Sequence, residues 1–180
     1  MKGIVFTEFM DMLDAQHSPR LVEEILDHVE LASGGAYTSV GTYDPSEMIA
    51  LVGEASAQTG IPVPDLLRTF GHHLFGRFVT LFPVFFEGVT SSFDFLPTVD
   101  SFVHLEVLKL YPDAELPTFG TDFSTPGSLR MTYRSSRNLP DLAHGLLEAA
   151  VKHFDDGLVI HRQPPAGEDG AVVFILSPAS

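Results

Sequence analysis

The chain has 180 residues, 44% of them hydrophobic and 19% charged, which is typical of one globular domain and excludes a disordered chain. Its net charge of −14 repels phosphate groups, so we expect neither nucleic acid nor an anionic membrane as a partner. Because the sequence has no cysteine, it cannot form disulfides, thiolate-bound metal centres or thiol-based redox sensors.

Apolar residues at helical spacing predict four helices in the first half of the chain. Ser18 and Pro19 form an N-cap followed by proline at the first helical position, which marks the start of the second helix. Its apolar face carries residues 22, 25, 26 and 29. The third helix starts near Asp44 and ends before Gly60, and the fourth carries a stripe of leucine and phenylalanine. The expected ranges are residues 4–13, about 19–29, 44–59 and about 64–82, with a loop at 32–43.

The second half mixes helices and strands. A fifth helix is predicted from roughly Phe95 to Tyr111, ending at Pro112. Alternating residues predict a strand over 129–137, and a helix follows at 141–154. Two further strands are predicted at 157–162 and 171–176, joined by a turn at 164–170. The fold class is therefore α+β, in a single unit over residues 1–180 with a helical N-terminal subdomain (about 1–60) and a C-terminal subdomain (about 61–180) that contains a small antiparallel sheet.

No targeting or membrane-spanning segment is recognisable. The apolar N-terminal stretch is soon followed by Glu8 and Asp11, which does not suit a signal peptide. The longest nearly continuous apolar run, Phe78 to Phe86, is far too short to span a membrane. We therefore expect a cytoplasmic protein.

His104 is the first candidate for chemistry. It lies in an apolar stretch of the fifth predicted helix, with Val107, Leu108 and Tyr111 on the same face. A neutral imidazole in such surroundings is a good axial ligand for iron, because its apolar neighbours keep competing water away. The alternative is a core histidine with a local hydrogen bond.

Tyr133, Ser135 and Arg137 form the second candidate group. If the strand continues to residue 137, these side chains point to the same face, because side chains alternate along a strand. Two hydroxyl groups and a guanidinium group suit one or two carboxylates, such as haem propionates. The alternative is a polar strand end that faces water.

Aromatic residues are the third signal. Nine phenylalanines lie between residues 70 and 102, on both sides of the segment that leads to His104. Such a stripe is usually plain core, but here it could equally form the walls around a flat apolar cofactor.

These residues together resemble the haem nitric oxide/oxygen binding (H-NOX) family, the bacterial relatives of the haem domain of soluble guanylate cyclase. The resemblance covers essentially the whole chain. It is carried by the opening Met1-Lys2-Gly3-Ile4-Val5, by His104-Leu105-Glu106-Val107 with Leu110-Tyr111, and by Tyr133-x-Ser135-x-Arg137.

The resemblance implies a haem b cofactor, buried between the two subdomains, with His104 as its iron ligand. It also implies that Tyr133, Ser135 and Arg137 hold the propionates and that Pro117 presses on the haem and distorts it. Phe78 falls where the family often has an aromatic residue over the distal pocket. Ligand binding would then loosen the iron–His104 bond and shift one subdomain against the other.

Gas selectivity follows from departures within the family pattern. Oxygen-binding members carry a distal tyrosine nine residues after the motif tyrosine, and Leu142 stands at that position here. The supporting polar positions correspond to Phe9 and Leu74, which cannot donate a hydrogen bond. We therefore expect ferrous haem that binds NO and CO without a stable O₂ complex.

The same resemblance suggests a sensor that is not an enzyme and that signals to a separate protein, a histidine kinase or a cyclic-di-GMP enzyme. Two alternatives stay open at this stage. One is a haem enzyme that acts on peroxide or NO, which would need a distal acid–base group. The other is a haem-free module that binds a different apolar carboxylate.

Overall fold

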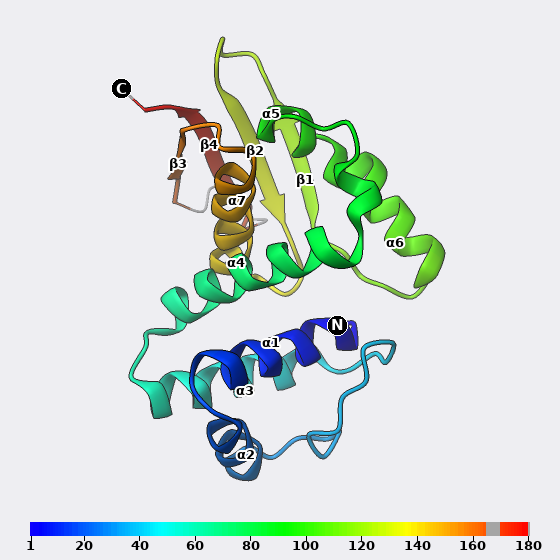
Figure 1. Ribbon diagram of the computed structural model, residues 1–180, viewed down its shortest axis with the longest axis vertical. Coiled ribbons are helices and arrows are strands. Elements are labelled where there is room, and N and C mark those ends of the chain that lie inside the picture. Colours follow the sequence, from blue (N-terminus) through cyan, green and yellow to red (C-terminus); the bar gives the residue numbers. More distant parts are fainter. Residues whose placement is uncertain (165–169, 180) are drawn as a thin grey trace.

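Three N-terminal helices and a four-stranded sheet lie on opposite sides of the long helix α4 in the computed structural model, which describes residues 1–164 and 170–179 (Figure 1). The predicted α+β fold class is confirmed. The helices are α1 (Gly3–Gln16), α2 (Pro19–His28), α3 (Pro45–Thr59), α4 (Val63–Leu81), α5 (Ser92–Phe95), α6 (His104–Leu110) and α7 (Pro140–Phe154), with a 3₁₀ turn η1 (Pro83–Phe86) and a π-helical turn η2 (Val99–Val103). The strands are β1 (Thr118–Asp122), β2 (Leu129–Arg134), β3 (Leu158–Arg162) and β4 (Val172–Pro178).

Local signals in the sequence place the ends of the first helices correctly. The Ser18 hydroxyl accepts a hydrogen bond from the backbone N–H of Leu21 at 3.2 Å, which caps α2. The Asp44 carboxylate accepts from the N–H of Ser46 at 2.8 Å and caps α3. Gly60 ends α3 in the left-handed conformation with φ of 73°, which favours glycine.

Helices α4 and α7 cross at two glycines. A Cβ atom on Gly71 would lie 2.6 Å from the carbonyl oxygen of Leu142, and one on Gly145 would collide with the backbone of Arg68. Glycine at both positions therefore lets the two helix backbones approach closely, and this crossing fixes where α7 presents its side chains.

The sheet has the order β1-β2-β4-β3, and every neighbouring pair is antiparallel. Strand β1 was not predicted, because Thr118–Asp122 is mostly exposed, contains Gly120 and shows no apolar alternation. The predicted strand over 129–137 is too long, because β2 ends at Arg134 and a turn follows. The predicted turn at 164–170 lies largely outside the described residues.

The prediction of one continuous helix from Phe95 to Tyr111 is wrong. Proline at position 97 has no N–H to donate, and α5 ends before it. The chain then forms η2, in which the N–H of His104 bonds to the carbonyl of Val99, five residues earlier. Only the last part, α6, is an α-helix, and it ends before Pro112 as expected.

Two clusters of buried side chains form the interior. The first joins α1, α2 and α3 to the first half of α4, down to Leu74. The second joins the sheet, α5 and α7, and it begins on α4 with Phe75. Helix α4 thus contributes to both cores, and the expected division into subdomains near residue 60 stays a prediction. Among the described residues, no helix combines the length and apolarity needed to cross a membrane.

Candidate functional site

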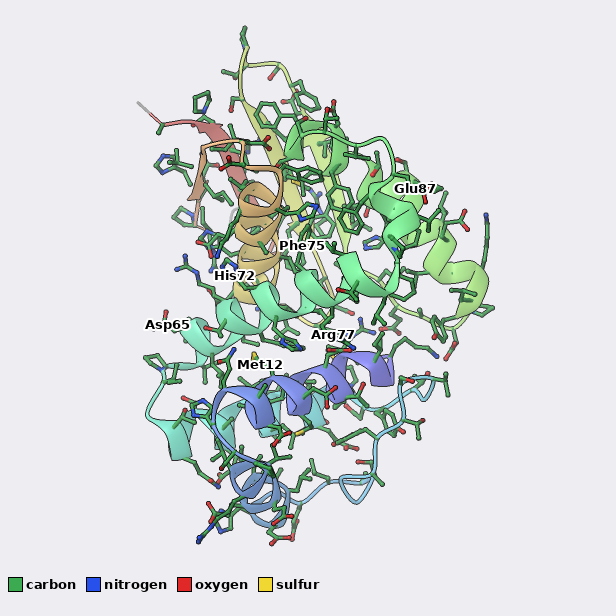
Figure 2. All side chains as sticks on the ribbon, in the orientation of Figure 1. Met12, Asp65, His72, Phe75, Arg77 and Glu87 are labelled. Carbon is green, nitrogen blue, oxygen red and sulfur yellow. The ribbon has the colours of Figure 1, made fainter. Side chains whose placement is uncertain are left out.

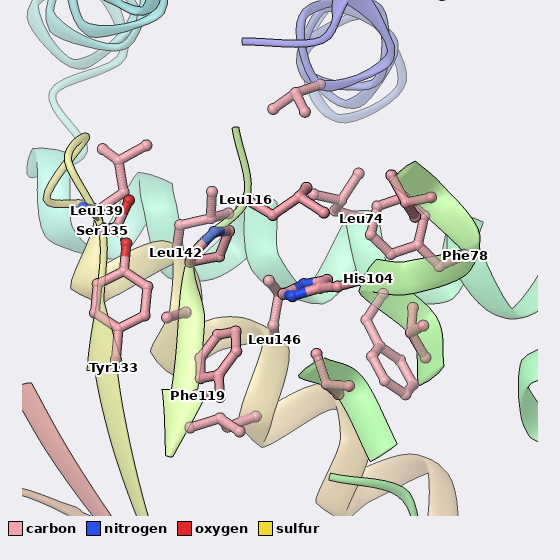
Figure 3. Close-up of a pocket in the computed structure, with 18 of the residues that line it drawn as sticks. Leu74, Phe78, His104, Leu116, Phe119, Tyr133, Ser135, Leu139, Leu142 and Leu146 are labelled. Carbon is pink, nitrogen blue, oxygen red and sulfur yellow. Dashed lines mark hydrogen bonds between the residues drawn. The ribbon is translucent and has the colours of Figure 1, made fainter. Parts of the chain in front are cut away.

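A cavity of about 280 Å³ lies between α4, α6, α7 and the sheet. Most of its wall is apolar, and its polar side chains gather mainly at two places: His104 in one wall, and Tyr133, Ser135 and Arg137 at one end. Figure 3 shows His104 in the central part of the cavity, with Phe78 toward one end and Tyr133 and Ser135 toward the other. Pockets of this kind, apolar with a few convergent polar groups, are typical of cofactor sites.

His104 lines the cavity next to the Asp100 carboxylate. Its side chain is 16% exposed, and its Nδ1 lies 2.9 Å from Oδ1 of Asp100. Burial lowers the pKa of His104 below its ordinary value, although the Asp100 carboxylate acts in the opposite direction. A carboxylate at this position favours the tautomer with its proton on Nδ1, which leaves the lone pair of Nε2 to bind a metal ion.

Tyr133, Ser135 and Arg137 all line the cavity, as the sequence suggested, but the strand expected to carry all three carries only Tyr133. Tyr133 lies on β2, whereas Ser135 and Arg137 belong to the turn that follows it. The Tyr133 hydroxyl accepts a hydrogen bond from the N–H of Leu139 at 3.2 Å, and the Ser135 hydroxyl accepts from the N–H of Arg137 at 3.2 Å. Each hydroxyl therefore keeps its own proton to donate to an acceptor in the cavity.

Arg137 is partly satisfied by its neighbours. One of its terminal nitrogens donates to the carbonyl oxygen of Glu115 at 2.5 Å, and the other lies 3.5 Å from the Glu115 carboxylate. Its Nε is buried and has no hydrogen-bond partner within the described part of the chain. A buried donor of this kind favours a ligand with a negatively charged oxygen.

The wall formed by α1, α4 and α7 is apolar throughout. Its lining side chains on these helices are Ile4, Val5, Leu74, Phe75, Phe78, Leu142, Ala143, Leu146 and Leu147. The structure thus brings the predicted residues Leu74, Phe78 and Leu142 to the cavity, together with Pro117. It does not bring Phe9 there: this side chain is fully buried in the N-terminal core, with its ring centre 5.1 Å from that of Phe70.

The sequence reasoning missed Asp100, although its spacing of four residues before His104 was a usable signal, since residues four apart are neighbours on a helix. It also missed the ion-pair cluster of Glu8, His73 and Arg77, which ties α1 to α4. The His73 Nε2 lies 3.1 Å from the buried Glu8 carboxylate, so this imidazole has a partner outside the cavity lining. Figure 2 shows Arg77 between the two helices.

The residues of the cavity fit haem. Haem is a flat apolar ring with an iron ion at its centre and two carboxylates at one edge. The cavity offers a free imidazole nitrogen from one wall, a broad apolar surface, and three donors at one end, including the buried and unpartnered Nε of Arg137. This donor set matches the chemistry of the cofactor at each of its three parts.

Comparisons with known proteins agree with this fit. The profile of the Haem-NO-binding family matches residues 2–162. The Fe(II) unliganded H-NOX protein from K. algicida is 36% identical to the chain, with a TM-score of 0.91 and coverage of 100% of this chain and 97% of that one. The H-NOX from Shewanella woodyi, solved with IWP-051 in the Fe(II)CO state, is 37% identical, with a TM-score of 0.85 and coverage of 99% and 95%.

An H-NOX protein from S. oneidensis in the Fe(II)NO state is 25% identical, with a TM-score of 0.87 and complete coverage of both chains. Among curated proteins, none matches the sequence.

Proposed function

We propose that this chain, which belongs to the haem-NO-binding (H-NOX) family, is a sensor of NO and CO. We further propose that it forms no stable complex with O₂. Members of the family are haem-based gas sensors, and haem is their cofactor. The finer parts of the proposal, namely the choice of gas and the output, rest on this chain's own residues.

The observation that carries the proposal is the contrast between the two sides of the cavity. His104 offers a neutral nitrogen from one side, whereas α1, α4 and α7 supply only apolar side chains on the other. When bound, ferrous haem supplies an open coordination position for a diatomic gas. Tyr133, Ser135 and Arg137 would hold its propionates, and Pro117 and Phe78 would pack against the ring.

The apolar wall explains the proposed selectivity. Bound O₂ takes on negative charge and is stabilised by a hydrogen-bond donor, whereas NO and CO need much less help. Leu142 and Leu74, which the family resemblance assigns to the distal tyrosine and to a supporting polar position, both line the cavity, and neither can donate a hydrogen bond. The relatives in the Fe(II)NO and Fe(II)CO states support gas binding as such.

We further propose that the chain is not itself an enzyme and that it signals to a separate protein. The net charge of −14 favours a basic protein surface as the partner. A histidine kinase or a cyclic-di-GMP enzyme, and a cytoplasmic location, stay predictions from the family resemblance.

Absorption spectra of the reduced protein test the gas selectivity. We expect a Soret band in the purified protein, shifts of that band on adding NO and on adding CO, and no stable oxy spectrum in air. A stable oxy spectrum would overturn the selectivity. A colourless protein that does not take up hemin would overturn the haem function and favour a site for another apolar carboxylate.

Turnover assays with peroxide and with NO address the remaining alternative, a haem enzyme. Such an enzyme needs a distal acid–base group, and the apolar wall provides none from α1, α4 or α7. We expect no turnover above that of free hemin. Sustained turnover would contradict the sensor proposal.

A further inference from the structure

Both carboxylate oxygens of Asp100 are in contact with other residues. It lies in the π-helical turn η2, four residues before His104, and its side chain is 34% exposed. Oδ1 is buried, lies 2.9 Å from Nδ1 of His104 in an ion-pair contact, and forms no hydrogen bond within the described residues. Oδ2 accepts a hydrogen bond from the backbone N–H of Phe119 at 2.7 Å.

The second contact comes from a different element of the fold. Phe119 belongs to β1, which pairs with β2 through Tyr133. The Asp100 carboxylate is therefore oriented by the sheet as well as by its own turn. The ring of Phe119 also lies next to His104, with ring centres 6.0 Å apart, so the contact with Asp100 and this packing both restrict how the imidazole can rotate.

A carboxylate in this position has two effects on an imidazole that binds iron. It keeps the proton on Nδ1, so that Nε2 carries the lone pair. It also increases the basicity of the ring, which strengthens the bond from Nε2 to the metal. Loss of such a partner typically lowers metal affinity about 10- to 100-fold.

We propose that Asp100 is the positioning residue for His104 and sets the strength of the bond between His104 and the haem iron. This inference rests on the proposed haem function and adds a residue to it. The carboxylate connects His104, the residue that would hold the iron, to the sheet edge, so the strength with which His104 would hold haem depends on Asp100.

Asp100→Asn tests the proposal in the haem-bound protein. The variant keeps the size of the side chain and an oxygen that can accept from the Phe119 N–H, but it loses the charge that faces His104. We expect resonance Raman spectra of the ferrous protein to show a lower iron–histidine stretching frequency than in the wild type. We also expect haem transfer to apomyoglobin to be about 10- to 100-fold faster.

Glu106→Gln is the matched control. It removes one negative charge two residues from His104, at a carboxylate that pairs with Lys109 instead of the imidazole. We expect an unchanged iron–histidine frequency and unchanged haem loss. Asp100→Glu keeps the carboxylate and should recover part of the wild-type frequency, which a purely structural role would not predict.

A measurement on the wild type keeps the proposal testable if the Asn variant does not fold. In the diamagnetic ferrous CO complex, the Nδ1 proton of His104 should appear at low field and exchange slowly with water, as expected for a proton bonded to a carboxylate. A rapidly exchanging proton, or an Asn variant with the wild-type frequency and haem loss, overturns the role of Asp100. A wild-type protein without a Soret band overturns instead the proposed function.

Discussion

The two sides of the cavity are built in different ways. On the His104 side, one carboxylate and one strand hold a single polar group in place through contacts of 2.9 and 2.7 Å. On the opposite side, α1, α4 and α7 present only apolar side chains, and the close crossing at Gly71 and Gly145 positions those of α4 and α7. Under the proposed function, the comparison teaches that binding of the cofactor would depend on a few directional contacts, whereas discrimination between gases would depend on the absence of such contacts.

Removing the imidazole should have the largest effect. His104→Gly removes the proposed iron ligand, and the apolar side chains of α1, α4 and α7 cannot replace it. We therefore expect loss of the five-coordinate ferrous spectrum and of most bound haem. Added imidazole should restore the spectrum by filling the space. His161→Ala, on the exposed face of β3, is the control and should keep its full haem content. Normal haem binding by the glycine variant without imidazole would contradict the assignment of His104.

Arg137→Ala tests the polar end of the cavity. The loss of one charge-assisted hydrogen bond costs about 1.5–3 kcal/mol, so haem dissociation should become about 10- to 100-fold faster. Transfer of haem to apomyoglobin measures this rate. Arg130→Ala removes an exposed arginine from the same strand as Tyr133 and should leave the rate unchanged. Equal rates for the two variants would remove Arg137 from the propionate site.

Leu142→Tyr adds a hydrogen-bond donor to the apolar wall of the cavity. The new hydroxyl can donate to bound O₂, and a neutral hydrogen bond contributes about 0.5–1.5 kcal/mol. We expect a detectable oxy spectrum and slower oxidation of the ferrous protein in air. Leu142→Phe provides a ring of similar size without the donor and should oxidise as fast as the wild type. If the two variants behave alike, the lack of a donor does not explain the selectivity.

Glu47, which does not line the cavity, should have the smallest effect, and that effect is on the pH dependence of stability. Burial alone would raise the pKa of this carboxyl, but hydrogen bonds from Ser33 and from the Tyr37 hydroxyl, the latter at 2.6 Å, hold it below its ordinary value. A lowered pKa stabilises the fold at pH values above the ordinary carboxyl pKa, and this stability is lost as the pH falls through the folded-state value.

Urea denaturation at pH 7, 5 and 4 measures this effect. The free energy of unfolding should fall with decreasing pH, and the fall should be smaller in Glu47→Gln. Gas spectra at pH 7 should not change in this variant. An identical pH dependence in both proteins would show that Glu47 contributes nothing to the acid sensitivity.

Several elements could be predicted from the sequence because their signals are local. Ser18 and Asp44 cap helices through their own side chains, and Gly60 ends one through its backbone conformation, so the first helices were found at nearly the correct residues. The break at Pro97 and the π-helical turn η2 were not predicted, because a π-turn has no apolar pattern that separates it from an α-helix. Strand β1 was missed for a related reason, since its pairing with β2 rather than its own residues makes it a strand.

The sequence by itself determined the kinds of groups available: an imidazole in an apolar segment, a Tyr-x-Ser-x-Arg motif, and leucine at positions 74 and 142. Only the tertiary structure decided which of them meet. It placed Phe9 in the N-terminal core, brought Ser135 and Arg137 to the cavity through a turn, and set Asp100 between His104 and the sheet. The physical reason is that residue type and local spacing fix side-chain chemistry, whereas contacts between distant segments depend on how the helices and strands pack.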